Sequence, residues 1–433
     1  MTQTRSTGQT LVQKILSRAA GKARVEAGEY LNVSPDYTCC QEIYWPIHKR
    51  HMAAIGVDRV AHPEKVVMVV DHTTSAAMGS PYHTVHKEVA DFARRNGIDN
   101  FFGPGSGLRH LVLAERGFAR PGMLVFSDEP NIASIGAFGA LNIPISWEVV
   151  VSLIGDENWV ALPMSARIEL DGKLPFGVTA RDLAQVVIRD FGATDRLLQC
   201  CVEYDGAIDC LSLDERQTLL ACTFHAGADT AIMPVDETAL RYVEDRAQGR
   251  PFFRFEADPD AEYSLRTRYA LDELSPMVTM PPQIHGAVPI ADVEGTRIDQ
   301  AAVGSCAGNR LDDMRAAAMV LKGRKVAPHV TFYISPGSRE IYAAAAREGL
   351  LEIFMDAGAT VLAPGCNTCW GYLGVLGDEQ VSITTHQFNY QGRNGSRSAR
   401  VHLAGPYAVA ASAVAGCITD PRPMLAEAGQ STS

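Results

Sequence analysis

The feature that most constrains the fold of this chain is the alternation of short apolar segments with amphipathic segments over most of its length. The apolar runs have the length and composition of buried strands and lie at 65–70, 122–126, 329–334 and 360–363. Helical patterns cover 83–95 and 339–348. This alternation predicts an α/β fold with parallel sheets and helices on both faces. In such folds ligands bind beyond the carboxyl ends of the strands.

Length and composition indicate a globular protein of several domains. The chain has 433 residues, of which 46% are apolar and 21% charged. At roughly 100–200 residues per domain, this length predicts two to four domains. Acidic residues and prolines accumulate at 250–290, which we interpret as the lead-in to the last domain, and a softer boundary lies near 162–163. We expect the tail after Pro423 to fray.

Charge and hydropathy argue against two classes of partner. The 39 basic and 50 acidic side chains give a net charge of −11, which disfavours a broad nucleic-acid-binding face. The most apolar stretch, 404–418, is interrupted by Gly and Pro and is shorter than the roughly 20 residues of a membrane helix. Residues 1–10 are polar and lack the apolar core of a secretion signal. We therefore expect a cytoplasmic protein that binds neither nucleic acid nor membrane.

Ten cysteines are too few in a chain of this length for a disulfide scaffold. Three of them stand in glycine-containing turns. Cys366 and Cys369 belong to Pro-Gly-Cys-Asn-Thr-Cys, and Cys306 belongs to Gly-Ser-Cys-Ala-Gly-Asn. We expect the others to be small buried apolar residues: Cys39, Cys40, Cys200, Cys201, Cys210, Cys222 and Cys417.

The spacing of these three cysteines fits several kinds of site. A Cys-x-x-Cys pair alone is found in redox dithiols, in zinc sites and in proteins without any site. Zinc would require a further ligand, and no second Cys-x-x-Cys stands in the sequence. Three thiolates on two turns suit an iron–sulfur cluster with one iron left open, and such an iron can act as a Lewis acid. The spacing by itself leaves these alternatives open.

The residues around the cysteines resemble a known family. Segments 304–313 and 364–369 resemble the cluster-binding turns of the aconitase and 3-isopropylmalate isomerase (dehydratase) large-subunit family. Further segments resemble this family in the same order along the chain: 102–110, 136–140, 392–395 and 400–403. The resemblance extends from about residue 10 to residue 418. On these motifs the chain is identified as a divergent member of the family.

The resemblance implies an aconitase-like architecture of three α/β/α domains around a central iron–sulfur cluster. We assign these domains to 1–165, 166–288 and 289–433. In the family a separate swivelling domain supplies a catalytic Ser base and an Arg, and nothing in these 433 residues resembles it. We therefore expect either a small swivel-domain subunit or an enzyme that works without this base.

The resemblance also implies the site. A [4Fe–4S] cluster would be held by Cys306, Cys366 and Cys369. The implied catalytic residues are Asp71, His72, His110 and Asp128, and the implied substrate-binding residues are Gln41 and Arg393. These residue types suit their roles, because an Asp–His pair can control a proton-donating group and an Arg can clamp a carboxylate.

The sequence departs from the family pattern around the substrate. The family's Asp-Ser-His reads Asp-Glu-Pro at 128–130, and its Asn and Glu beside the open iron read Ala221 and His225. A substrate-binding Arg of the family reads Phe388. We place His225 and Phe388 among the substrate-binding candidates. We predict a substrate with fewer carboxylates than citrate, or one with an apolar group beside Phe388.

The predicted function is an iron–sulfur-dependent hydro-lyase or isomerase that acts on a small hydroxy-acid-like substrate and differs from aconitase and isopropylmalate isomerase. One alternative is a lyase of the same fold whose open iron takes another group, such as sulfide. An alternative of another class is an RNA-binding regulator or a non-catalytic subunit, and the net charge of −11 weighs against RNA.

Overall fold

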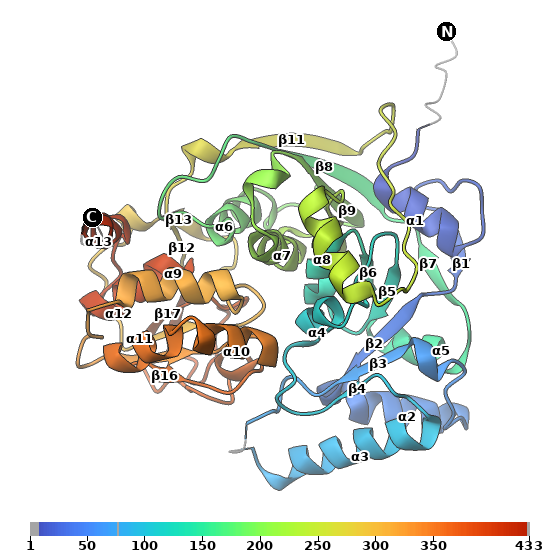
Figure 1. The fold of residues 1–433 in the computed structure, drawn as a ribbon, viewed down its shortest axis with the longest axis horizontal. Helices are drawn as coiled ribbons and strands as arrows, with labels where there is room; N and C mark the ends of the chain where they lie inside the picture. The colour runs from blue at the N-terminus through green and yellow to red at the C-terminus, as the bar shows by residue number, and fades with distance from the viewer. Residues whose placement is uncertain (1–7, 76–77, 431–433) are drawn as a thin grey trace.

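The computed structural model describes residues 8–75 and 78–430. Three large sheets follow one another along the chain, and helices pack on their faces (Figure 1). In Figure 1 the first sheet lies in the blue to teal part of the chain, the second in the green to yellow part, and the third in the yellow to red part.

The first sheet has the strand order β4-β3-β2-β5-β6, and all of its neighbouring strands are parallel. Its strands are β2 (Tyr37–Gln41), β3 (Val66–Val69), β4 (Phe101–Phe102), β5 (Leu124–Ser127) and β6 (Leu141–Pro144). The helices of this part are α1 (Leu11–Ala19), α2 (Trp45–Ile55), α3 (Ser80–Asn96), α4 (Arg109–Glu115) and α5 (Val149–Ile154). A small antiparallel sheet lies beside it, formed by β1 (Tyr30–Val33) and β7 (Asn158–Ala161).

The second sheet has the order β10-β9-β8-β11 and is also entirely parallel. Its strands are β8 (Met164–Asp171), β9 (Cys200–Gly206), β10 (Thr230–Ile232) and β11 (Leu265–Ala270). Its helices are α6 (Ala180–Phe191), α7 (Leu213–Cys222) and α8 (Glu237–Ala247).

The third sheet has the order β13-β12-β18-β17-β14-β15-β16, with β12 antiparallel to both of its neighbours and the other pairs parallel. Its strands are β12 (Met277–Thr279), β13 (Ala287–Pro289), β14 (Gln300–Val303), β15 (Thr331–Ile334), β16 (Thr360–Val361), β17 (Val381–Thr384) and β18 (Arg400–Ala404). Its helices are α9 (Leu311–Leu321), α10 (Arg339–Arg347), α11 (Leu350–Ala357), α12 (Pro406–Ala415) and α13 (Arg422–Gln430).

Short 3-10 helices occupy many connections. They are η1 (Glu42–Tyr44), η2 (Pro63–Lys65), η3 (Pro130–Phe138), η4 (Ser146–Glu148), η5 (Ile208–Cys210), η6 (Thr223–Ala226), η7 (Leu271–Glu273), η8 (Ile290–Asp292) and η9 (Asn367–Trp370). No helix in the described part of the chain is both long and apolar enough to cross a lipid bilayer.

The predicted α/β fold with parallel sheets is confirmed. The expectation of a frayed tail after Pro423 is wrong up to residue 430, because α13 continues from Arg422 to Gln430, and residues 431–433 lie outside the described residues. Leu425 is buried in the core of the third part, and the Arg324 guanidinium donates to the Met424 carbonyl at 3.0 Å. The division into domains at residues 165 and 288 stays a proposal.

The hydrophobic cores do not correspond one to one with the three sheets. One core joins side chains of the first and second sheets, for example Val67 with Ile168, whereas the third sheet and its helices form a core of their own. The first and third parts meet through loops, where the Cys366 N–H donates to the Asp71 carbonyl at 3.0 Å. Loops at strand ends therefore face one another across this boundary.

Candidate active site

A cavity of about 300 Å³ lies between the loops of the first and third parts. Its first wall comes from the segments that follow β2, β3 and β5, and its second wall comes from those that follow β14, β16 and β17. Seven of the predicted residues line it: Gln41, His72, Cys306, Cys366, Cys369, Phe388 and Arg393. The other four lie outside the lining: Asp71, His110, Asp128 and His225.

The turn that carries His72 is held by a buried carboxylate. Strand β3 is apolar and buried, and the chain leaves the sheet at Asp71. Glu42 accepts hydrogen bonds from the backbone N–H groups of Asp71, His72 and Thr73 at 3.1, 2.8 and 2.6 Å. Four donors reach this carboxylate when the Thr73 hydroxyl at 2.9 Å is included. Glu42 therefore fixes where His72 points.

Asp71 and His72 form a buried ion pair. The His72 Nδ1 donates to the Asp71 Oδ1 at 2.6 Å. Burial alone would lower the pKa of His72, but the charge of Asp71 and this hydrogen bond raise it to about 9. Burial likewise opposes ionisation of Asp71, but its contact with His72 holds its pKa at about 2. His72 is thus protonated at neutral pH and can supply a proton to the cavity.

Asp128 lies behind the first wall in a charge network around Arg109. The Arg109 guanidinium pairs with both Asp128 and Glu129. Asp128 also bonds the His48 Nε2 at 3.0 Å and accepts the Gln41 backbone N–H at 3.2 Å. Asp128 therefore contacts residues of the wall rather than the cavity.

His110 lies at the start of α4 and is buried. Its Nε2 has no hydrogen-bond partner among the described residues. Burial, followed by the positive charge of Arg310, holds the pKa of His110 well below its usual range, so the ring is neutral. Its catalytic role stays a prediction.

The three cysteines converge on the second wall. Cys306 follows β14, whereas Cys366 and Cys369 stand in the loop after β16. Gly365 adopts φ +153°, and a Cβ there would lie 2.3 Å from the Thr74 hydroxyl, so this turn requires glycine. All ten cysteines are unpaired. Of the seven that we expected to be buried, Cys210 and Cys417 are partly exposed, because they lie in a 3-10 turn and after α12.

The donor set of three thiols on one wall suits an iron–sulfur cluster with one iron left open. Glu42, Asp71 and His72 form a group whose possible ligand atoms all lie within 4.8 Å of one another, but their polar atoms already bond one another and the backbone. Four atoms of the lining have no partner among the described residues and can take a bound group: Asn131 Oδ1, Ser305 Oγ, Trp370 Nε1 and Gln387 Oε1.

Aromatic rings surround the guanidinium of Arg393. Its central carbon lies 4.7 Å from the centroid of the Phe388 ring, 5.0 Å from that of Trp370 and 5.6 Å from that of Tyr390. Its Nε donates to the Cys369 carbonyl at 2.8 Å, and its Nη1 donates to the Tyr390 hydroxyl at 3.0 Å. Arg393 is therefore anchored against the wall and can still bind one carboxylate.

His225 lies behind Phe388 and does not reach the cavity. The two ring centroids are 4.9 Å apart in an edge-to-face arrangement. Burial, with the charge of Arg181, lowers the pKa of His225 to about 3, so the ring is neutral. His225 packs as an aromatic support for Phe388.

Sequence reasoning missed several residues of this site. Glu42, Arg109 and Glu129 each stand next to a residue that it selected, at the end of a strand or the start of a helix, so inspection of neighbouring charged residues would have found them. Trp370 follows Cys369 directly, but nothing in the sequence indicates that its ring and that of Tyr390 pack on Arg393, because this packing is a tertiary contact.

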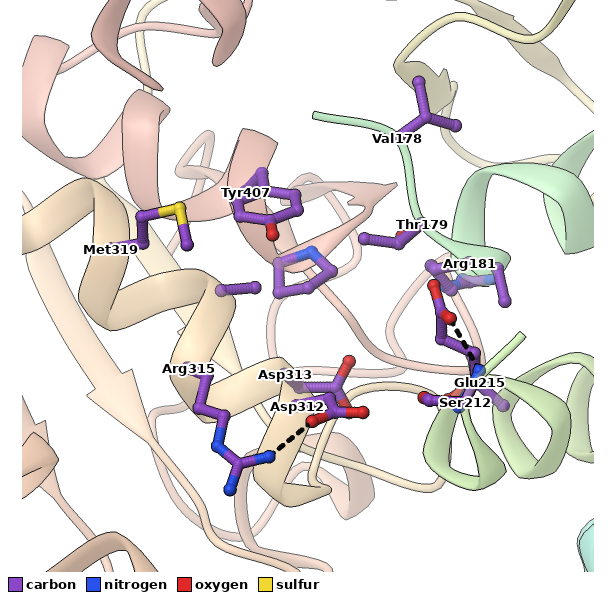
Figure 2. Close-up of a pocket in the computed structure, with 14 residues that line it drawn as sticks. Val178, Thr179, Arg181, Ser212, Glu215, Asp312, Asp313, Arg315, Met319 and Tyr407 are labelled. Atoms are coloured by element: carbon purple, nitrogen blue, oxygen red, sulfur yellow. Dashed lines mark hydrogen bonds and ion pairs between the residues drawn. The ribbon is translucent and has the colours of Figure 1, made fainter. Parts of the chain in front are cut away.

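A second cavity of about 310 Å³ lies between α6 and α7 of the second part and α9 and α12 of the third (Figure 2). No thiol is among the described residues that line it. Its acidic groups bond locally: Arg315 donates to Asp312 at 2.8 Å, and the Ser212 N–H donates to Glu215 at 3.0 Å (Figure 2). The cavity lined by Cys306, Cys366 and Cys369, called the cysteine cavity below, differs from this second cavity in the chemistry of its lining and not in its volume.

Comparison with known proteins supplies the decisive observation. The family model for the aconitase family (aconitate hydratase) matches residues 13–416. The chain belongs to the aconitase family. A 3-isopropylmalate dehydratase large subunit of Methanopyrus kandleri is 36% identical over 96% of this chain and 100% of the relative. A probable 3-isopropylmalate dehydratase large subunit of Methanothermobacter thermautotrophicus is 37% identical, over 95% of this chain and 98% of the relative.

A probable methanogen homoaconitase large subunit from Methanothermobacter thermautotrophicus is 35% identical over 95% of this chain and 97% of the relative. Membership of the aconitase family confirms the predicted family, the fold class and an enzyme of the hydro-lyase type. Aconitase-family dehydratases use iron–sulfur clusters, and these relatives are named as large subunits.

Proposed function

We propose that this chain is the cluster-binding large subunit of a hydro-lyase for a small hydroxy acid. The observation that carries the proposal is the convergence on one cavity of three buried thiols, the protonated His72 and the aromatic-backed Arg393. A [4Fe–4S] cluster would be held by Cys306, Cys366 and Cys369. When bound, it supplies a Lewis-acidic iron to a hydroxyl or carboxylate oxygen.

The residues of this chain would bind the acid and protonate its leaving hydroxyl, and the base that takes the carbon-bound proton would come from the small swivel-domain subunit. Arg393 binds the substrate carboxylate through the donors that Cys369 and Tyr390 leave free. His72, fixed by Asp71 and Glu42, donates a proton to the leaving hydroxyl. The rings of Phe388 and Trp370 exclude water from the bound acid.

The second wall of the cavity limits which acids can bind. Phe388 presents an apolar ring where a carboxylate would lose its hydration without a partner. The substrate therefore has fewer carboxylates than citrate, or an apolar group beside Phe388. A small swivel-domain subunit completes the enzyme, in line with the large-subunit names of its relatives.

Anaerobic purification followed by iron analysis and dehydration assays tests the proposal. We expect about four irons per chain and turnover of a small hydroxy acid once the small subunit is added. Citrate, which has three carboxylates and no apolar group, should be a poor substrate. Colourless protein that holds one zinc, or turnover of citrate at about 1–10³ per second, would contradict the proposal. A Phe388→Arg variant should gain affinity for citrate, with Phe253→Arg on the surface as a matched control.

A further inference from the structure

Glu129 is the one carboxylate among the described residues that line the cysteine cavity. It follows β5, and its side chain is 18% exposed. Arg109 pairs with one of its oxygens, and the other accepts the Asn131 Nδ2 at 2.5 Å. With both oxygens anchored, the carboxylate is held on the wall beside the substrate.

Asn131 adds a second acceptor at the same place. Because its Nδ2 donates to Glu129, its Oδ1 is the atom that remains free. Asn131 is 3% exposed, and this Oδ1 has no partner among the described residues. A buried amide oxygen is stabilised by any ligand that donates a hydrogen bond to it.

The charge on this wall disfavours a second carboxylate. Three carboxylates, those of Asp71, Asp128 and Glu129, surround the two cations Arg109 and His72, so the group keeps a net negative charge. A substrate carboxylate next to Glu129 would meet a like charge, whereas a hydroxyl or an ammonium would meet two acceptors. Among the lining residues, Arg393 offers a guanidinium on the other wall.

We propose that Glu129 and Asn131 form an acceptor subsite that determines specificity. The substrate carries one carboxylate for Arg393 and a hydrogen-bond donor, either hydroxyl or ammonium, for Glu129 and Asn131. This inference rests on the proposed function, which it narrows to a class of acids with a single carboxylate and a donor group.

Three probes that differ in one group test the subsite. Malate presents a second carboxylate, 3,4-dihydroxybutanoate presents a hydroxyl in its place, and 4-amino-3-hydroxybutanoate presents an ammonium. Affinities are measured by calorimetry on the cluster-loaded full chain with its small subunit. We expect at least one donor probe to bind about tenfold more tightly than malate. The tighter of the two identifies the donor as hydroxyl or ammonium.

Two variants test whether the preference for the donor probes over malate depends on Glu129 and Asn131. Glu129→Gln removes the charge at constant size and should reduce the preference over malate about tenfold. Asn131→Leu removes the free acceptor and should weaken the donor probes while leaving malate within twofold of wild type. Glu237→Gln, on the surface of α8, is the matched control. Thermal unfolding of each variant verifies that it is folded.

Several outcomes overturn the subsite. These are malate binding as tightly as both donor probes, no binding of either donor probe to loaded protein, or an unchanged preference in folded Glu129→Gln. Iron content and turnover are recorded on the same preparation. A protein without iron and without turnover refutes the proposed function, whereas a loaded, active enzyme with unchanged preference refutes the subsite alone.

Discussion

The two cavities have nearly the same volume, about 300 and 310 Å³, and both lie where separate parts of the chain meet. They differ in how their acidic groups are held. In the cysteine cavity, burial of Asp71 is outweighed by His72, and its pKa falls to about 2. In the cavity of Figure 2, burial, with the nearby charges of Asp214 and Asp312, raises the pKa of Asp313 to about 7 despite Arg310.

This difference separates a reactive site from a packing boundary. Asp71 is charged at neutral pH because His72 and Arg109 lie beside it, and the pair is ready for proton transfer. Asp313 accepts a hydrogen bond from the backbone N–H of Arg310 at the start of α9. Its raised pKa comes from burial in this packed position and so has a structural cause. An acidic residue with a shifted pKa indicates a catalytic site only when a proton donor and a cavity lie beside it.

The largest expected effect is loss of the cluster from the cysteine cavity. Cys306→Ala, Cys366→Ala or Cys369→Ala should each remove most of the iron and all measurable turnover, because each thiol is one of the three proposed ligands. Iron analysis and the absorption of anaerobically purified protein measure this. Cys210→Ala changes a partly exposed thiol outside the cavity and should keep full iron content. Full iron in any of the three variants would contradict the ligand assignment.

The next effect concerns His72. His72→Ala should lower turnover about 10²–10⁴-fold while the iron content stays normal, because the variant loses its proton donor but no thiol. Steady-state assays and iron analysis on the same sample measure both. His62→Ala, a surface histidine, is the control. Near-normal turnover of His72→Ala would reduce this residue to a structural one.

A smaller effect tests Glu42 as the residue that positions His72. Glu42→Gln places an amide donor among N–H donors, so the turn shifts, and kcat should fall roughly 10–100-fold. KM should change little, since Glu42 does not line the cavity. Glu42→Asp should recover part of kcat. A rise in KM with unchanged kcat would assign Glu42 to substrate binding instead.

The smallest effect on activity is expected in the cavity of Figure 2. Asp313→Asn should leave turnover within about twofold of wild type, because the residue is not part of the site. Its effect is on the pH dependence of stability. The pKa of Asp313 rises from 3.8 to about 7 on folding, so the free energy of unfolding of wild type should decrease as pH rises from about 4 to 7.

Asp313→Asn should remove this decrease, up to about 4 kcal/mol by the size of the pKa change. Urea unfolding at pH 4.5, 6 and 8 measures it, with Asp260→Asn in an exposed turn as the control. A variant with the same pH dependence as wild type would show that other acids produce it. A loss of turnover in Asp313→Asn would instead show that this cavity takes part in the activity and that the two cavities do not differ in role.

The sequence by itself determined the fold class and the set of residues at the strand ends. Apolar runs at 65–70 and 122–126 predict β3 and β5, because buried parallel strands are continuous apolar segments. Glycine turns around Cys306 and Cys366 are local features, so their motifs and the family could be recognised without coordinates.

Only the tertiary structure decided which side chains face the cavity and which stand behind it. Asp128 matched a family motif and His225 replaced a family Glu, yet Asp128 pairs with Arg109 and His225 packs against Phe388. Glu42 holds backbone groups about thirty residues along the chain, and Glu129 shares Arg109 with Asp128. These contacts join distant segments through charge and shape, which depend on three-dimensional distance rather than on position in the sequence.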